Sequence, residues 1–155
     1  MRIPLPLTHC WANDADIIRN RATSIADGLD LGFALIHKER PRPNEVSRMV
    51  LVGDVQDRIA IVVDDMADTC GTLVKAADVV LAHGARECIA IVTHGILSGD
   101  AIEKLNGSQL KKLVVTNTVP HEAKKRLCDR IETIDISPTV SDPLFLERWC
   151  GRDVC

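Results

Sequence analysis

The chain has 155 residues, a length typical of one domain, and 46% of them are hydrophobic, which is enough to build a single core. The formal net charge is −3, which argues against general affinity for nucleic acid, because such affinity needs a strongly cationic surface. No apolar run reaches about 18 residues, so we expect no transmembrane helix. The short apolar N-terminus is broken by Pro4 and Pro6, so we expect no signal peptide.

Aliphatic periodicity predicts alternating helices and strands. Apolar positions over 14–31 recur every three or four residues, as in an amphipathic helix, whereas 59–63 is a run of apolar, mostly β-branched residues typical of a buried strand. The other expected elements, in chain order, are strands over 33–36 and 50–52, a helix over 72–83, a strand over 88–92, a short helix over 99–105, and strands over 113–115 and 131–136. This order predicts the α/β fold class, a parallel sheet flanked by helices, and the alternating polarity of 131–136 indicates an edge strand.

Cysteines and histidines are spread along the chain without the spacing of a metal or redox site. The six cysteines include no C-x-x-C pair, and the five histidines include no H-x-x-x-H pair. Cys88 lies in an apolar strand-like run and Cys70 in a polar loop, which favours free thiols over a disulfide framework. We therefore expect a cytoplasmic protein, and a zinc site has little support.

Polar residues follow three of the expected strands. They are an Asp-Asp pair at 64–65, a Thr-His pair at 93–94 and a Thr-Asn pair at 116–117. In open parallel sheets, ligands bind beyond the carboxyl ends of the strands. We expect these three clusters to lie along one edge of the sheet.

The segment 66–72, Met-Ala-Asp-Thr-Cys-Gly-Thr, joins the first of these strands to the next expected helix. A strand-to-helix turn of this composition directs backbone N–H groups and the positive end of the helix dipole into one concavity, which suits a phosphate. The hydroxyls of Thr69 and Thr72 can donate to phosphate oxygens, and Gly71 allows a close approach to the backbone. The turn lacks the G-x-x-x-x-G-K-[ST] pattern, so we do not expect a standard ATP-phosphate loop.

The carboxylates of Asp64 and Asp65 would repel a phosphate that touched them. They suit the vicinal hydroxyls of a sugar, which donate hydrogen bonds to carboxylates. Paired acids after a strand also commonly cap the next helix, and Asp64 or Thr69 alone would favour that interpretation. The whole arrangement over 63–72 favours a ligand with a diol at one end and a phosphate at the other, which is a sugar phosphate.

The segment 63–72 resembles the phosphoribosyl pyrophosphate loop of type I phosphoribosyltransferases and ribose-phosphate diphosphokinases. Further segments are similar, in order, to the diphosphokinases, also called phosphoribosyl pyrophosphate synthetases: 23–27, 33–40, 49–55, 93–99, 116–120 and 134–137. The resemblance extends over about residues 20–137 and implies a type I phosphoribosyltransferase-like fold. A nucleobase phosphoribosyltransferase would need a base-binding hood, which we do not find in the sequence.

The resemblance implies a transferase that moves the pyrophosphoryl group of ATP to the anomeric hydroxyl of ribose 5-phosphate, a reaction of nucleotide biosynthesis that requires Mg²⁺. By position, it implies that Lys38 is the catalytic lysine and that Arg40 lies close to the ribose phosphate. It also implies that Asp64 and Asp65 hold the ribose hydroxyls, directly or through Mg²⁺. The residues implied to hold the 5-phosphate are Asp68, Thr69, Cys70, Gly71 and Thr72.

The resemblance divides the chain into a divergent N-terminal segment (1–13), a ribose-5-phosphate-binding domain (14–137) and a divergent C-terminal tail (138–155). Enzymes of the family are longer, and their first half supplies the adenine pocket, so we expect a truncated member that binds ATP only with a partner subunit. The resemblance also implies a homo- or hetero-oligomer with other synthetase subunits. The alternative is a non-catalytic regulatory or associated subunit of the same complex. Subunits of that kind lose the acidic and Thr-Gly pattern of the loop, which this sequence keeps.

Overall fold

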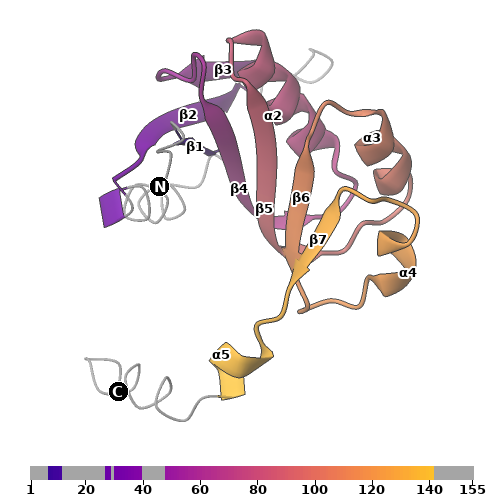
Figure 1. Ribbon diagram of the computed structural model, residues 1–155. Helices are drawn as coiled ribbons and strands as arrows, with labels where there is room; N and C mark the ends of the chain where they lie inside the picture. Colours follow the sequence, from indigo (N-terminus) through magenta and orange to yellow (C-terminus); the bar gives the residue numbers. More distant parts are fainter. Residues whose placement is uncertain (1–6, 12–26, 29, 40–47, 142–155) are drawn as a thin grey trace.

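The computed structural model describes residues 7–11, 27–28, 30–39 and 48–141. The elements, in chain order, are β1 (Leu7–Trp11), β2 (Gly32–Glu39), β3 (Arg48–Val52), β4 (Ile59–Ala67), α2 (Gly71–Ala82), β5 (Glu87–Gly95), α3 (Ala101–Gly107), β6 (Lys112–Thr116), α4 (Glu122–Lys125), β7 (Ile131–Ile134) and α5 (Ser137–Ser141). Within these ranges the strands form one sheet in the order β3-β2-β1-β4-β5-β6-β7 (Figure 1). No helix in the described part has the length and apolar character of a membrane span.

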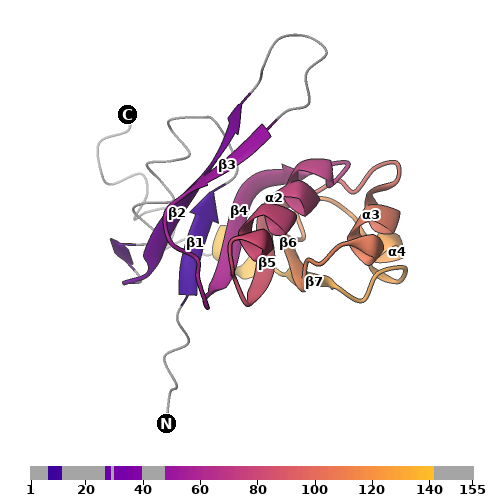
Figure 2. The same ribbon diagram turned by 90° about the horizontal axis from the view of Figure 1, so that it is seen from above.

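All neighbouring strands are parallel except β2 and β3, so the predicted α/β fold with a parallel sheet is confirmed. The exception follows from chain length. A parallel crossover needs a dozen or more residues, and only 40–47 separate β2 from β3, so the two strands pair as an antiparallel hairpin (Figure 2). The expected edge position of the last strand is also confirmed, because β7 ends the sheet.

Strand β1 was not expected, because residues 1–13 show no clear periodicity. It lies between β2 and β4 and is parallel to both, with Thr8 opposite both Gly32 and Ala60. The helix expected over 14–31 falls mainly outside the described residues, and 27–28 are helical. Two short helices, α4 and α5, were not expected either, and α5 lies away from the helices that pack on the sheet (Figure 1).

The core lies between the sheet and helix α2, with α3 beside α2 (Figure 2). Side chains alternate across a strand. The buried residues are Ala60 and Val62 of β4 and Cys88, Ala90 and Val92 of β5, whereas the apolar residues between them are half-buried. Helix α2 contributes Leu73, Ala76, Ala77 and Val80. The small side chains of the α2 face allow the helix to lie close to the sheet, which fixes the position of its first turn.

Candidate functional site

The order of the strands identifies one place in the sheet where the direction of winding reverses. From β1, the chain continues outward to β2 and β3, and then returns to β4 on the other side of β1. In open α/β sheets, such a switch point opens a crevice at the carboxyl ends of the two central strands, where ligands bind. The segment that follows β4 is the loop singled out by the sequence, so the topology and the motif indicate the same site.

Strands β4 and β5 are longer than expected. The sequence predicted that β4 would end at Val63 and β5 at Val92, but the two strands stay paired as far as Ala67 and Gly95. The expected ends were wrong because charged and polar residues at a sheet edge can remain in a ladder when a neighbouring strand runs beside them. Asp64 and Asp65 therefore belong to the last part of β4 and not to the loop.

Asp64 lies opposite Val92 of β5 in the ladder, whereas the ladder skips Asp65 and resumes at Met66. Asp64 is half-buried and Asp65 is exposed, and the Asp65 amide donates a hydrogen bond of 2.9 Å to Asp64 Oδ1. Within the described residues, no group of three or more potential metal-ligating side chains is present. The pair fits Mg²⁺ that arrives with substrate oxygens, which needs one or two carboxylates, and does not by itself form an all-protein metal site.

The connection between β4 and α2 consists of Asp68, Thr69 and Cys70. Cys70 adopts a left-handed backbone conformation with φ 57° and ψ 1°, and its side chain is only 3% exposed. The first backbone bond of the helix runs from the Val74 amide to the Cys70 carbonyl, at 3.0 Å. The amides of the first turn precede that bond and have no partner within the helix.

Left-handed backbone in bulky residues is concentrated beside this loop. Of the described residues other than glycine with positive φ, two are aspartates, which tolerate this conformation, and the other two are Cys70 and Leu97 (φ 53°). Leu97 is 2% exposed, and its amide donates to the Ala67 carbonyl at 2.9 Å. Such strain costs about 1–3 kcal/mol per residue and persists where the surrounding structure imposes it, most often at ligand sites.

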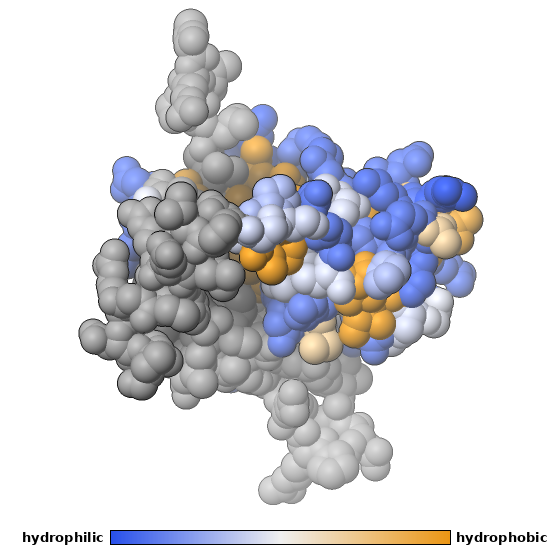
Figure 3. Space-filling view, turned by 90° about the horizontal axis from the view of Figure 1, so that it is seen from below, coloured by the Kyte–Doolittle hydropathy of each residue, from blue (hydrophilic) through white to orange (hydrophobic). Residues whose placement is uncertain are grey.

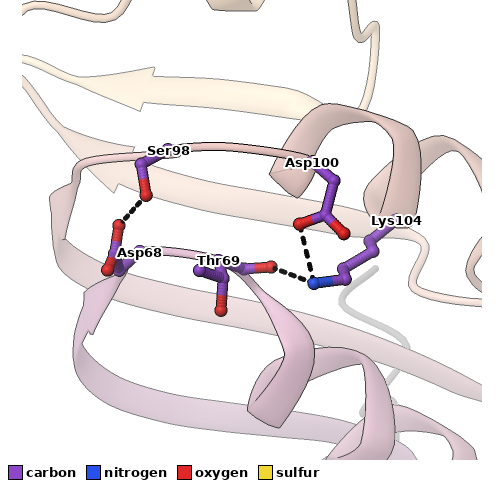
Figure 4. Close-up of polar contacts among 5 residues, drawn as sticks. All are labelled: Asp68, Thr69, Ser98, Asp100 and Lys104. Carbon is purple, nitrogen blue, oxygen red and sulfur yellow. Dashed lines mark hydrogen bonds and ion pairs between the residues drawn. The ribbon is translucent and has the colours of Figure 1, made fainter.

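The segment after β5 holds the loop from one side (Figure 4). The Ser98 amide donates to the Asp68 carbonyl at 3.0 Å, and the Ser98 hydroxyl donates to the Asp68 carboxylate. Lys104 of α3 donates from Nζ to the Thr69 carbonyl at 3.4 Å and pairs with Asp100 Oδ1 at 2.7 Å. The sequence did not predict that Ser98 and Lys104 contact the loop, because residues 30 or more positions away along the chain carry no local sign of such a contact.

Gly71, the first residue of α2, has open space where a side chain would lie. A Cβ built there meets nothing nearer than Thr69 Oγ1, at 4.0 Å, and the backbone of Gly71 is not left-handed. Neither packing nor conformation therefore accounts for a glycine. Thr69 is exposed and Thr72 is half-buried, and within the described part of the chain neither hydroxyl makes a hydrogen bond. The backbone at Gly71 therefore borders open space, and the two threonine hydroxyls nearby are available as donors.

The ionisation of the loop follows from its surroundings. Burial raises the pKa of the Cys70 thiol to about 11, although the nearby positive charge of Lys104 acts in the opposite direction. Cys70 is therefore a neutral side chain that anchors the loop and not a thiolate. The hydrogen bond from Lys104 lowers the pKa of the Asp100 carboxyl, so this ion pair persists at neutral pH.

A second polar cluster lies at the carboxyl ends of β5 and β6. His94 and Asn117 form an isolated antiparallel β-bridge, and His94 Nδ1 lies 2.8 Å from Thr118 Oγ1. The Thr116 hydroxyl donates to the Thr93 carbonyl at 2.7 Å. Seen from this edge, the described surface is mostly hydrophilic, with separate hydrophobic patches (Figure 3). The expectation that the three polar clusters lie at one edge is confirmed by the parallel pairing.

Two predicted site residues, Lys38 and Arg40, come before the loop in the sequence. Lys38 lies in β2, where its backbone is opposite Met49 of β3, and not in a loop after the strand. Arg40 lies outside the described residues. The roles of Lys38 and Arg40 stay predictions.

Comparison with known proteins adds the family. Residues 40–145 match the phosphoribosyl synthetase-associated domain. The chain belongs to the phosphoribosyl synthetase family. It is 63% identical over 124 residues to ribose-phosphate pyrophosphokinase 1 of Candida albicans and 61% identical over 124 residues to ribose-phosphate pyrophosphokinase 3 of Saccharomyces cerevisiae. Each alignment covers 80% of this chain and 39% of the relative, so the chain spans about two fifths of the length of these synthetases.

A solved synthetase structure has the same fold. The crystal structure of phosphoribosylpyrophosphate synthetase from Mycobacterium smegmatis superposes with a TM-score of 0.77 at 29% sequence identity, over 95% of this chain and 46% of that chain. The resemblance seen in the sequence motifs is therefore confirmed at the level of family and fold. This chain corresponds to the C-terminal part of a synthetase.

Proposed function

We propose that this chain binds ribose 5-phosphate at the β4–α2 loop and forms the sugar-phosphate half of a ribose-phosphate diphosphokinase site. In the complete reaction, the pyrophosphoryl group of ATP passes to the anomeric hydroxyl of ribose 5-phosphate, giving phosphoribosyl pyrophosphate and AMP. We propose that contacts to ATP come from a further subunit in a homo- or hetero-oligomer. The single observation that supports the proposal best is the open space beside Gly71, at the start of α2.

The 5-phosphate would lie against the amides at the start of α2, with the hydroxyls of Thr69 and Thr72 as additional donors. A phosphate gains from orphan amide donors and from the positive end of the helix dipole. Cys70 contributes through its backbone, because its thiol is buried and neutral. Asp68 likewise contributes through the shape of the loop, since its carboxylate accepts from Ser98 and would repel a phosphate.

The ribose hydroxyls would lie toward Asp64 and Asp65, one strand segment before the phosphate loop. The two carboxylates would also hold Mg²⁺, which, when bound, supplies charge neutralisation at the phosphate oxygens. The proposal keeps Lys38 as the catalytic cation and Arg40 as a contact of the sugar phosphate. A cation directed at the oxygens that gain charge in the transition state lowers the barrier without forming a covalent bond.

The organisation of the chain is part of the proposal. We propose that 14–137 forms the ribose-5-phosphate-binding domain, with 1–13 and 138–155 as divergent ends. We also propose a cytoplasmic location, which the free, buried thiols of Cys70 and Cys128 support, because unpaired cysteines are typical of reducing compartments.

Calorimetric titration of the full chain tests the sugar-phosphate site. Ribose 5-phosphate with Mg²⁺ is expected to bind saturably, whereas ribose, which lacks the phosphate, and inorganic phosphate, which lacks the diol, are each expected to bind at least about tenfold more weakly. An Asp64→Asn, Asp65→Asn double variant is expected to lose at least about tenfold in affinity, because hydrogen bonds to charged groups contribute about 1.5–3 kcal/mol each. Asp78→Asn, at an exposed position of α2, is the matched control.

Failure of the folded wild-type chain to bind ribose 5-phosphate would refute the proposed site and favour the associated-subunit alternative. If it binds, release of AMP from ATP is then measured with and without a full-length synthetase. Turnover that appears only in the mixture supports an enzyme subunit. Binding without turnover in either case leaves a sugar-phosphate-binding regulatory subunit.

A further inference from the structure

We infer that Lys104 is a positioning residue that orients the Thr69–Cys70 peptide so that its N–H faces the bound phosphate. The inference rests on the proposed function of the loop. It adds a residue outside the loop, on a different helix, whose side chain acts on the loop backbone and not on the ligand.

The bond from Lys104 fixes the direction of the Thr69–Cys70 peptide. In a planar trans peptide, the C=O and the following N–H point in opposite directions. Lys104 Nζ donates to the Thr69 carbonyl at 3.4 Å (Figure 4). The N–H of the same peptide, which belongs to Cys70, therefore points away from the Lys104 ammonium. By the same geometry, the bond from the Ser98 amide to the Asp68 carbonyl turns the Thr69 N–H away from the 97–104 segment. Two successive amides are thus turned from the supporting segment.

This direction of the peptide requires a left-handed backbone at Cys70. A peptide reverses its direction by rotation about ψ of the preceding residue and φ of the following residue together, because the plane moves as a unit. Reversal of the Thr69–Cys70 peptide would move φ of Cys70 from 57° to negative values, which are favoured for a side chain of this kind. The loop therefore has an alternative conformation that relieves strain and removes one amide from the phosphate site. The bond from Lys104 opposes that change.

An ion pair with Asp100 holds the Lys104 side chain in place. Its partner Asp100 immediately precedes α3, four residues earlier, and accepts from Nζ at 2.7 Å. The Lys104 side chain is 38% exposed, so it is partly screened, and it reaches the Thr69 carbonyl from a helix packed beside α2. An ammonium group has three donors, and these two bonds fix its place between the helix and the loop.

The charge of Lys104 is a competing explanation, because the loop is surrounded by acidic groups and a nearby cation attracts phosphate. The two effects are separable. A charge effect weakens with salt, since the screening length falls from about 10 Å at 0.1 M to about 3 Å at 1 M. An effect on peptide direction does not, and a neutral donor of suitable length retains part of it.

The experiment compares ribose 5-phosphate binding by the wild-type chain and by Lys104→Met, Lys104→Gln and Lys104→Arg variants, with Lys111→Met as the control. Lys111 pairs with Glu87 at 2.6 Å and lies just before β6, at the amino ends of the strands and away from the loop. We expect about a tenfold loss of affinity in Lys104→Met, in the range of one charge-assisted hydrogen bond. Lys104→Arg should retain most of the affinity, and Lys104→Gln should retain part of it. The loss of affinity in each variant should persist at 1 M salt.

A second readout separates the conformation from the binding. The three-bond HN–Hα coupling of Cys70, measured by NMR on the labelled chain without ligand, reports its φ. It should rise toward the large value of extended backbone in Lys104→Met, because reversal of the peptide leaves Cys70 with a negative, extended φ, and it should stay unchanged in Lys111→Met. If the wild-type chain binds and Lys104→Met changes neither the coupling nor the affinity, the inference is wrong. If the loss disappears at 1 M salt with the coupling unchanged, Lys104 acts by charge and the inference is again wrong. Absence of wild-type binding would instead overturn the proposed function, which the coupling does not measure.

Discussion

The β4–α2 loop and the polar cluster after β6 lie at the same edge of the sheet but use their polar groups differently. After β6, side chains satisfy one another: Asn117 donates to Asp135 at 2.6 Å and accepts from the Ile136 amide at 3.1 Å. In the loop, backbone carbonyls are bonded to Ser98 and Lys104, whereas the hydroxyls of Thr69 and Thr72 have no partner within the described residues.

This difference distinguishes a structural cluster from a binding site of similar composition. Buried polar groups in folded proteins are nearly always hydrogen-bonded. The hydroxyls of Thr69, which is exposed, and Thr72, which is half-buried, are open to solvent and therefore available to a ligand, whereas a closed network stabilises the chain. The predictions below test whether the two regions separate binding from stability in this way.

The largest effect is expected from filling the open space of the loop. Gly71→Leu places a side chain where the phosphate would lie, while a Cβ there meets only Thr69 Oγ1 at 4.0 Å, so the chain should fold normally. We expect ribose 5-phosphate affinity to fall about a hundredfold, equivalent to about 2.7 kcal/mol. Calorimetry measures the affinity, with Gly107→Leu as control, since a Cβ at Gly107 meets nothing within 4 Å. Unchanged affinity would show that no ligand approaches the backbone at Gly71.

The next effect concerns the buried thiol beneath the loop. An unfolded cysteine ionises near pH 8.5, whereas burial raises the pKa of Cys70 to about 11. The folded state therefore favours the neutral thiol, and this contribution is fully present below about pH 8.5 and lost as the pH rises to about 11. We expect the free energy of unfolding to fall by about 2 kcal/mol more in the wild-type chain than in Cys70→Ala over this interval. Urea denaturation at several pH values measures the difference, and equal slopes would contradict it.

A smaller effect, on stability alone, is expected in the cluster after β6. Asn117→Ala removes the bonds to Asp135 and Ile136, and we expect a loss of about 1 kcal/mol in the free energy of unfolding, because the group is exposed. Ribose 5-phosphate affinity should stay within about twofold of wild type, in contrast to Gly71→Leu. A loss of affinity similar to that of Gly71→Leu would show that the closed network also contacts the ligand, and the comparison would fail.

The smallest effect is expected at the amino ends of the strands, on the opposite side of the sheet from the loop. Lys112 and Glu132 form an ion pair whose side chains are 49% and 55% exposed, and the hydrogen bond from Lys112 lowers the pKa of the Glu132 carboxyl. Exposed pairs of this kind contribute about 0–1 kcal/mol, so Lys112→Ala should change neither stability nor binding beyond about 0.5 kcal/mol. A thermal melt and one titration suffice, and a larger change in binding would mean that the site extends beyond the carboxyl edge.

The sequence by itself predicted the α/β class, the core strands after residue 58, helix α2, the edge strand β7 and the loop that carries the candidate phosphate site. It did so because these features are local: the strand period, the β-branched runs and the Thr-Gly turn occupy neighbouring positions. The family resemblance was also carried by contiguous motifs, from 23–27 to 134–137.

Only the tertiary structure placed β1 between β2 and β4, and so put the loop at the switch point of the sheet. Only the structure showed that β4 continues past Asp64 and Asp65, and that Ser98 and Lys104 hold the loop backbone. The physical reason is the same in each case. Strand pairing and a lysine bonded to a carbonyl 35 residues earlier are contacts between distant parts of the chain, and no local periodicity reports them.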